Sequence, residues 1–151
     1  MSASLKRFVD SRNVSAEFVE LPPERAKTSG LAAASVNCDV NQIAKSIVLK
    51  GSETYVVVLA GDRRIDLKKF SKLVGEPVRL ATPDEVYDST GFRVGCVPPF
   101  GHVKKLKTYV DVSVLANRVV FASGGMDNAL LKISVDELMR VLEAETVDVS
   151  K

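Results

Sequence analysis

Apolar side chains recur along this chain first at helical spacing and then in the short runs typical of strands. Residues 4–13 carry them on one face, which predicts a short helix. Residues 18–21, which are apolar except for Glu20, predict a strand that is ended by the two prolines that follow. Thr28 stands where an N-cap would precede a second helix over residues 30–36. The alanines of this second helix indicate close packing against a neighbouring element.

The middle of the chain has the strongest strand signal. Residues 46–50 and 55–60 predict two strands joined by a tight connection, and the second strand is apolar on both faces. A strand of that kind lies centrally in a sheet that is covered on both sides. A helix is then predicted to open at Gly61 and Asp62 and to end at Gly75.

The remaining segments continue to alternate between strands and helices. Capping boxes that begin at Thr82 and Ser134 each predict the start of a helix. Further strands are predicted at residues 78–80, 108–112, 118–122 and 130–133, with a turn of helix at 113–117. Because both hairpins and crossovers occur, the pattern predicts one α/β (α+β) domain over residues 1–151, with a mixed sheet flanked by helices.

Composition agrees with one globular domain and argues against several other classes of protein. The 151 residues are 46% hydrophobic and 26% charged, and no apolar run reaches the roughly 20 residues that cross a bilayer. The chain begins without the apolar stretch of a signal peptide. Its two cysteines form no CxxC motif, and a single histidine gives no zinc-type spacing. We therefore expect a reduced, cytoplasmic protein with no metal, no cofactor and no membrane partner.

Basic residues gather in two places, although the net charge is only +2. The first group falls on the helix predicted after Gly61 and consists of Arg63, Arg64, Lys68, Lys69 and Lys72. The second group directly follows a loop rich in glycine and proline at residues 91–102 and consists of Lys104, Lys105 and Lys107. Such clusters attract phosphate backbones through counterion release. The alternative is that the two basic groups have no ligand and are only the solvated face of a helix and the charged edge of a strand.

The glycine-proline loop over residues 91–102 is the most informative stretch. Three glycines and two prolines exclude an ordinary helix or strand there. Glycine permits positive φ and the close approach of a ligand, while proline fixes φ and removes an N–H donor. A rigid loop of this kind presents backbone N–H and C=O groups to a small polar ligand. The alternative is a tight connection between two strands.

Side chains suited to catalysis are few. Cys96 and His102 share the loop and are the candidate nucleophile and base, although their spacing does not establish contact. The plainer reading makes Cys96 a small semi-buried side chain and His102 a surface histidine at the start of a strand. Lys45 directly precedes the strand at residues 46–50, where its ammonium group is placed to hold an anionic or hydroxyl-rich ligand.

Four segments of the chain occur in the order found in one known family. They are Ala44-Lys45-Ser46-Ile47-Val48-Leu49-Lys50, the strand at 55–60, the stretch at 61–69, and Thr90-Gly91-Phe92 with Gly95-Cys96-Val97-Pro98-Pro99-Phe100-Gly101. On these segments the chain resembles the YbaK/prolyl-tRNA-synthetase-associated domain family, the free-standing trans-editing aminoacyl-tRNA deacylases. The likeness covers residues 14–142, and its most specific parts are the lysine beside the apolar strand and the GxxxP loop.

The resemblance implies a mixed sheet flanked by helices and hydrolysis of the ester that joins a wrong amino acid to tRNA. Lys45 matches the family's lysine, which helps hold the terminal adenosine and its phosphate. Ser46 matches a position that is often a small hydroxyl residue. The backbone of the matching GxxxP loop would face the scissile carbonyl and the aminoacyl group: Gly95, Cys96, Val97, Pro98 and Pro99.

The resemblance also implies further substrate-binding residues: Phe100, Gly101 and His102 after the loop, the glycine corner Ser123, Gly124 and Gly125, and Asn128. This chain departs from the family at Pro98, where a serine or threonine is usual, and at residues 129–131, which are apolar where some members carry an aspartate. These departures concern the specificity for the amino acid.

Ester chemistry fits a site without the usual catalytic side chains. An aminoacyl ester is already activated, so a positioned water and donors aimed at the developing oxyanion suffice. The expected partner is the acceptor end of an aminoacyl-tRNA, and the resemblance allows a cognate aminoacyl-tRNA synthetase as a second one. Val97 and the two prolines would form a rigid sieve, and the basic clusters would hold the acceptor stem. Two rival hypotheses are a catalytically silent tRNA-binding module of the same fold and a small-molecule hydrolase using Cys96 and His102.

Overall fold

The structure is a computed structural model that describes residues 3–25 and 28–151. Residues 1, 2, 26 and 27, which the predicted domain over residues 1–151 includes, lie outside the described residues. The α-helices of the described part are α1 (Ala3–Ser11), α2 (Ser29–Ser35), α3 (Leu67–Val74), α4 (Pro83–Thr90) and α5 (Val135–Leu142). Short 3-10 turns lie at η1 (Pro23–Arg25), η2 (Val40–Gln42) and η3 (Val112–Ala116).

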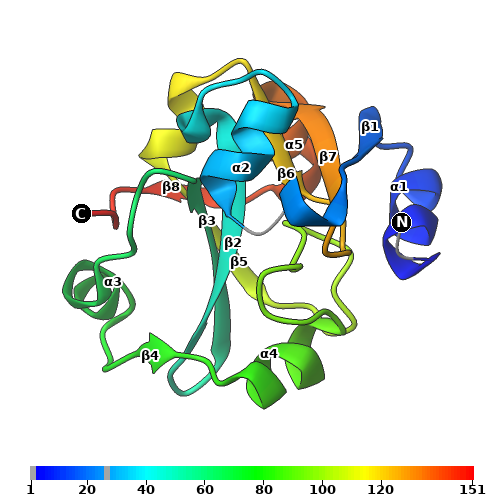
Figure 1. Cartoon of the computed structure of the whole chain (residues 1–151). Coiled ribbons are helices and arrows are strands. Elements are labelled where there is room, and N and C mark those ends of the chain that lie inside the picture. Colours follow the sequence, from blue (N-terminus) through cyan, green and yellow to red (C-terminus); the bar gives the residue numbers. More distant parts are fainter. Residues whose placement is uncertain (1–2, 26–27) are drawn as a thin grey trace.

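The strands form one mixed sheet, as the sequence predicted (Figure 1). They are β1 (Ala16–Glu20), β2 (Ile43–Lys50), β3 (Thr54–Ala60), β4 (Arg79–Leu80), β5 (Lys107–Asp111), β6 (Val119–Ser123), β7 (Ala129–Ser134) and β8 (Glu145–Val147). Their order is β1-β7-β6-β2-β3-β5-β8, with β4 paired to β2 outside this path. The β2–β6, β3–β5 and β5–β8 pairs are parallel, and the other pairs are antiparallel.

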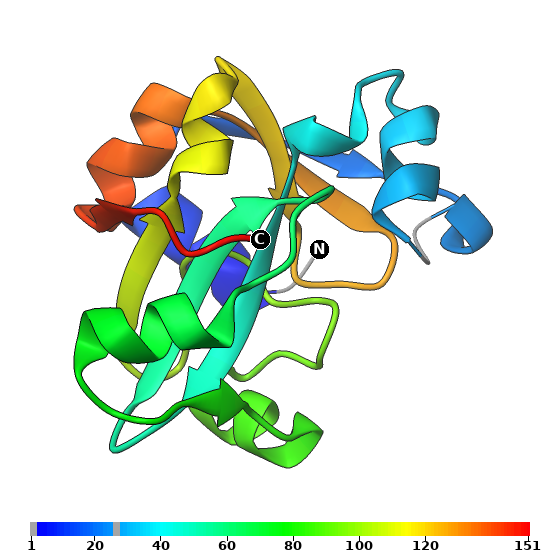
Figure 2. The ribbon, with the colours of Figure 1, turned by 90° about the vertical axis from the view of Figure 1, so that its left-hand side faces the viewer.

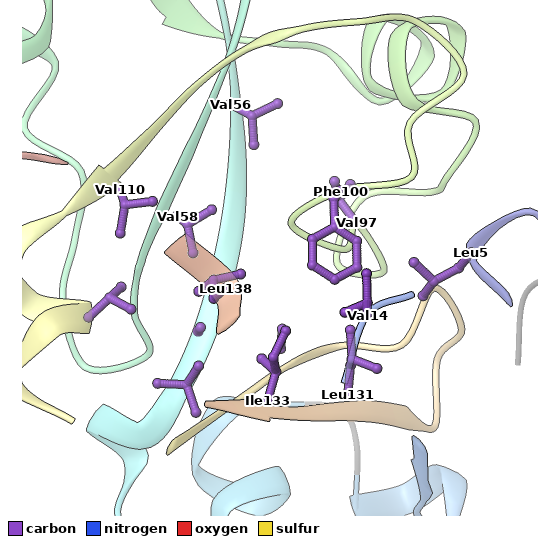
Figure 3. Packing of buried hydrophobic residues seen from close by; sticks show 14 of the residues in the cluster. Leu5, Val14, Val56, Val58, Val97, Phe100, Val110, Leu131, Ile133 and Leu138 are labelled. Atoms are coloured by element: carbon purple, nitrogen blue, oxygen red, sulfur yellow. The ribbon is translucent and has the colours of Figure 1, made fainter. Parts of the chain in front are cut away.

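The core lies on both faces of the sheet, because β3 is apolar on both faces and central. Its residues Val56 to Leu59 are fully buried. On one face, Val56 and Val58 pack in a cluster with side chains of α1 and α5, part of which Figure 3 shows. On the other face, Val57 and Leu59 pack against Phe70 of α3. Figure 2 shows α3 crossing the front of the sheet in green, with the C-terminal segment above it.

Local sequence signals set most helix ends as expected. Thr28, Thr82 and Ser134 each accept a hydrogen bond from a backbone N–H of the first helical turn. Gly75 ends α3 in the left-handed conformation, with φ +78°. The capping boxes therefore predicted α4 and α5 correctly.

The segment after β3 differs from the prediction. The helix expected from Gly61 and Asp62 begins only at Leu67, because Asp66 caps it by accepting from the backbone N–H groups of Lys68 and Lys69. Arg63 and Arg64 consequently lie in the irregular segment between β3 and α3, so their predicted placement on the helix was wrong. The chain before Asp66 instead contacts the C-terminal segment, where Ile65 forms an antiparallel bridge with Ser150.

Two strand assignments also needed correction. β2 begins at Ile43, three residues earlier than predicted, because β6 pairs with its first two residues. β8 was not predicted at all, since its three residues carry little apolar pattern and are held by pairing with β5.

Candidate active site

A cavity of about 410 Å³ opens beside the middle of the sheet. β2 supplies one wall, and the glycine-proline loop supplies another through Val94, Gly95 and Val97. α2, the β4–α4 connection and the chain between β6 and β7 complete the lining. The cavity therefore brings together segments that are far apart in the sequence, including the two that carry the family motifs.

β2 has an open edge where it borders this cavity. β6 pairs only with its first two residues and β4 only with its last two. Within the described part of the chain, residues 45–48 have a strand neighbour on the β3 side alone. On the open side, the Val48 carbonyl accepts from the Ala81 N–H at 3.0 Å. Because carbonyl directions alternate along a strand, the N–H and C=O of Ser46 point to this same open side.

Lys45 lies inside β2, not before the strand as the sequence predicted, because the strand begins earlier. It lines the cavity, and its Nζ donates to the carbonyl oxygen of Gly61 at 3.4 Å. Burial lowers the pKa of this amine; the nearby Asp62 carboxylate raises it, and the Arg64 guanidinium lowers it further. Loss of solvation makes a compensating anion favourable at this position.

Ser46 follows on the same strand and also lines the cavity. Its Oγ is buried and has no hydrogen-bond partner among the residues that the structure describes. A buried hydroxyl without a partner costs roughly 1–3 kcal/mol. A polar ligand atom in the cavity would remove that cost.

The glycine-proline loop divides into two parts. Gly95 and Val97 line the cavity, and Gly95 has φ +86°. Pro98 and Pro99 are buried and do not line it. Phe100 stacks on Phe8 of α1, with ring centroids 5.0 Å apart (Figure 3 shows the Phe100 and Val97 side chains).

The end of the loop is anchored to the same helix. Gly101 has φ +80° and packs closely on Leu5, whose Cδ1 would lie 3.1 Å from an added Cβ. Of the residues predicted at this end, none lines the cavity: Pro98, Pro99, Phe100, Gly101 and His102.

The loop residues that line the cavity are Val94, Gly95 and Val97, and their backbone N–H groups are the candidate donors to a ligand. Pro98 and Pro99 have no N–H, and the Cys96 N–H donates to the Arg93 carbonyl at 2.9 Å. Among the described residues, the N–H groups of Gly95 and Val97 have no hydrogen-bond partner. Both of these residues line the cavity.

Cys96 and His102 do not form the nucleophile–base pair considered from sequence. The Cys96 Sγ donates to Asp127 Oδ1 at 3.0 Å, and burial and this contact raise the pKa of the thiol to about 11. His102 Nε2 lies 2.7 Å from the Pro98 carbonyl oxygen, and burial lowers the pKa of the ring. His102 is thus a half-buried residue that braces the loop, not the surface histidine expected. A neutral thiol held by a carboxylate is a poor nucleophile.

The glycine corner contributes one predicted residue to the cavity, Ser123. The Gly124 N–H donates to the Ala129 carbonyl at 2.8 Å, which closes the turn. Gly125 and Asn128 line a neighbouring cavity of about 250 Å³, together with Cys96.

Asp127 was missed from sequence, although it is the one carboxylate beside the corner. It lines both the 410 Å³ cavity and the smaller one. Its position two residues after Gly125 is the only signal that the sequence offered.

Two classes of site find no support in the described residues. No group of three or more histidine, cysteine, aspartate or glutamate side chains there is arranged to hold a metal ion. In the same part of the chain, every helix is too short or too polar to cross a membrane.

Comparison with known proteins identifies the family. Residues 23–141 match the model of the aminoacyl-tRNA editing domain, and the chain belongs to this family. The protein YwhH of Bacillus subtilis (strain 168), described as uncharacterized, is 34% identical over 109 residues, which are 71% of this chain and 69% of that protein. The multifunctional Ser/Thr-tRNA deacylase ProXp-y of Escherichia coli (strain K12) is 31% identical over 117 residues, 72% of this chain and 70% of that protein.

A solved structure gives the same result at the level of the whole fold. It is described as a candidate trans-editing enzyme for prolyl tRNA synthetase and superposes with a TM-score of 0.93 at 37% sequence identity. The superposition covers 100% of this chain and 99% of the other. The resemblance noted from the motifs is therefore confirmed for both family and fold.

Proposed function

We propose that this protein is an aminoacyl-tRNA deacylase, which hydrolyses the ester of a mischarged tRNA in trans. In this proposal, Lys45 holds the terminal adenosine and its phosphate at the open edge of β2. The aminoacyl group lies in the cavity, with its carbonyl toward Gly95 and Val97. Family membership and the ProXp-y relative support the reaction class.

The observation that supports the proposal is the 410 Å³ cavity itself, which is lined by Lys45 and Ser46 of β2 and by Gly95 and Val97 of the loop. The N–H groups of these two loop residues have no partner among the described residues. Two such donors are the usual means of stabilising the oxyanion formed when water attacks an ester carbonyl. The electron pair of the broken bond leaves with the ribose oxygen, which takes up a proton released by the water. No protein nucleophile is required.

Size selection follows from the walls of the same cavity. Val97, Ala129 and Leu130 are apolar and line it, so we propose that they limit the length of the amino-acid side chain. The two prolines that follow Val97 are buried and do not line the cavity. One methylene is worth about 1–3 kcal/mol in such a pocket, so exclusion by size is the effective means of sparing a correct amino acid.

A panel of tRNAs charged with different amino acids tests the proposal through release of free amino acid. We expect the wild-type protein to release at least one small amino acid. Lys45→Ala should reduce kcat/KM about 10²-fold or more, since truncating one partner of a desolvated charge contact costs roughly 2–5 kcal/mol. Lys50→Ala is the matched control, because this lysine is on the same strand but bonds Thr54 Oγ1 at 3.2 Å, outside the cavity.

The rival hypotheses give different results in the same assay. A catalytically silent module binds tRNA but releases nothing from any member of the panel. A thiol hydrolase loses all activity in Cys96→Ala. The proposed mechanism uses neither the side chain nor the N–H of residue 96, so this variant should retain activity within about tenfold.

A further inference from the structure

A second cavity, of about 660 Å³, adjoins the first and is not used by the proposed reaction. The two cavities share three lining residues: Lys45, Ile47 and Leu80. Lys45 and Ile47 are neighbours on one face of β2, and the Leu80 side chain, 54% exposed, stands across from them on β4. A ligand that fills the first cavity and extends past Lys45 therefore enters the second.

The walls of the second cavity are basic. Arg64, Lys68 and Lys151 line it together with Lys45, and Asp66 is the one acidic side chain among the lining residues that the structure describes. The Asp66 carboxylate already accepts from the backbone N–H groups of Lys68 and Lys69 as the cap of α3. No ion pair within the described residues uses the side chains of Arg64, Lys68 or Lys151. Their charges are available to an anionic ligand.

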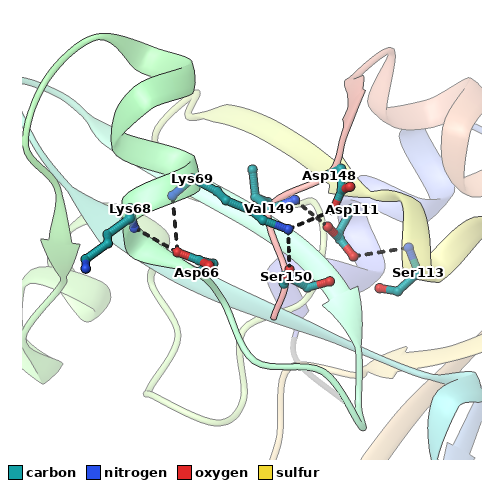
Figure 4. Close-up of polar contacts among 8 residues, drawn as sticks. All are labelled: Asp66, Lys68, Lys69, Asp111, Ser113, Asp148, Val149 and Ser150. Atoms are coloured by element: carbon teal, nitrogen blue, oxygen red, sulfur yellow. Dashed lines mark hydrogen bonds and ion pairs between the residues drawn. The ribbon is translucent and has the colours of Figure 1, made fainter.

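The neighbouring basic residue Lys69 shows the contrast. Its Nζ donates to the Ser150 carbonyl at 3.1 Å and pairs with Asp148 at 3.5 Å, so it ties α3 to the C-terminal segment. Figure 4 shows Lys69 extended toward Ser150, while the Lys68 side chain points away from this cluster. The same helix therefore uses Lys69 to contact the C-terminal segment, while the preceding Lys68 lines the cavity.

Apolar side chains complete the second cavity. Ile47, Ile65, Leu67 and Leu80 lie among its basic residues. A site that combines aliphatic surface with several cations suits a nucleotide, whose base and ribose have apolar faces and whose phosphodiester is anionic. Its volume lies within the range of about 300–1,000 Å³ that is usual for small-ligand sites.

We propose that this second cavity is a nucleotide subsite, which binds the phosphodiester and the nucleotide that precede the terminal adenosine at the 3′ end of the RNA. The inference rests on the proposed function, since it takes the terminal adenosine to lie at Lys45. Arg64 and Lys68 contact the phosphodiester, and Lys45 stands between the two subsites. The other basic group, Lys104, Lys105 and Lys107, lines neither cavity and has no part in this contact.

The double variant Arg64→Ala/Lys68→Ala tests the subsite with two substrates that carry the same amino acid. One is the full mischarged tRNA, and the other is an aminoacyl-adenosine without any phosphate. We expect kcat/KM on the tRNA to fall at least tenfold, mainly through KM, and kcat/KM on the aminoacyl-adenosine to stay within twofold. The salt dependence of tRNA binding should also weaken by about 0.7 in the slope of log K against log salt, which is the contribution of one phosphate contact on a single strand.

Lys104→Ala/Lys105→Ala is the matched control, because it removes the same charge from exposed positions outside both cavities. It should change kcat/KM on the tRNA less than twofold. Equal losses in the two double variants would overturn the subsite in favour of a general charge effect. A loss on the aminoacyl-adenosine as large as on the tRNA would also overturn it, as would no loss on either substrate.

Binding of uncharged tRNA separates this inference from the proposed function. If the wild-type protein hydrolyses neither substrate, the proposed function fails, and the subsite is judged by affinity alone. The wild type should then bind intact tRNA at least tenfold more tightly than tRNA trimmed by its last two nucleotides, and Arg64→Ala/Lys68→Ala should lose that difference. Equal affinity of the wild type for both RNAs would refute the subsite.

Discussion

The two halves of the glycine-proline loop serve different purposes. Gly95 and Val97 line the cavity, and their N–H groups have no partner among the described residues, whereas Phe100 and Gly101 are packed against α1. His102, which follows the second half, contacts the Pro98 carbonyl oxygen through Nε2 and so connects the two halves. Gly95 is exposed, whereas Val97 is buried in the same apolar cluster as Phe100, so the packing of the second half supports a residue that lines the cavity.

This difference shows how a loop can hold backbone donors in place without being part of a helix or strand. Val97 is buried, and a buried N–H without a partner costs free energy, so the surrounding packing must offset that cost. Here the Phe100–Phe8 stack and the burial of the two prolines provide the compensating free energy. Mutations in the second half should therefore affect folding, and mutations in the first half should affect catalysis.

The largest expected effect is on stability, from Phe100→Ala. Phe100 is 4% exposed and stacks on Phe8, and truncating a buried phenylalanine costs about 3–5 kcal/mol. For a chain of this size, the midpoint of thermal unfolding should fall by roughly 6–20 °C. Calorimetry or circular dichroism measures this shift. If kcat fell about 10²-fold while the midpoint hardly moved, Phe100 would instead belong to the substrate site, as the sequence suggested.

The sequence predicted the fold well where local signals and burial agree. β3, α4 and α5 follow from an apolar run and two capping boxes, and each of these signals depends only on nearby residues. The early start of β2 and the whole of β8 depend on pairing with β6 and β5. Such pairing joins residues that are distant in sequence, so no local pattern contains it.

The candidate site divides in the same way. The motif identified Lys45, Ser46, Gly95 and Val97, which the cavity brings together. The motif could not separate these from Phe100 and Gly101, because glycine and aromatic residues suit a ligand site and a tight packing contact equally well. Asp127 could not be predicted, because its contact is with Cys96, which is distant in the sequence.

The next effect in size is on catalysis, from Gly95→Ala. Alanine at φ +86° is strained, and no atom lies within 4 Å of the added Cβ, so the backbone alone determines the result. A shift in this peptide misplaces a donor to the oxyanion, which should lower kcat about 10²-fold, with about 1–2 kcal/mol lost in stability. Steady-state kinetics and chemical denaturation measure the two effects.

Gly75→Ala is the matched control for this substitution. Gly75 has φ +78° and equally open surroundings, but it ends α3 and does not line the cavity. It should lose similar stability and keep its kcat. If both alanine variants lost kcat to the same extent, the donors of the loop would not be the cause.

The smallest effect concerns pH and comes from His102, which connects the two halves of the loop. Burial lowers the pKa of its ring, although the Pro98 carbonyl acts in the opposite direction. The unfolded chain, with a pKa of about 6.5, therefore takes up a proton at a pH where the ring of the folded protein is still neutral. The unfolded state then binds more protons, and stability is lost as the pH falls below about 6.5 until the lower folded pKa is passed. His102→Gln removes this contribution, so the difference in unfolding free energy between wild type and variant should shrink between pH 7 and pH 5. A difference that stayed constant over this range would show that the ring does not titrate differently on folding, and the link between the two halves would then rest on packing alone.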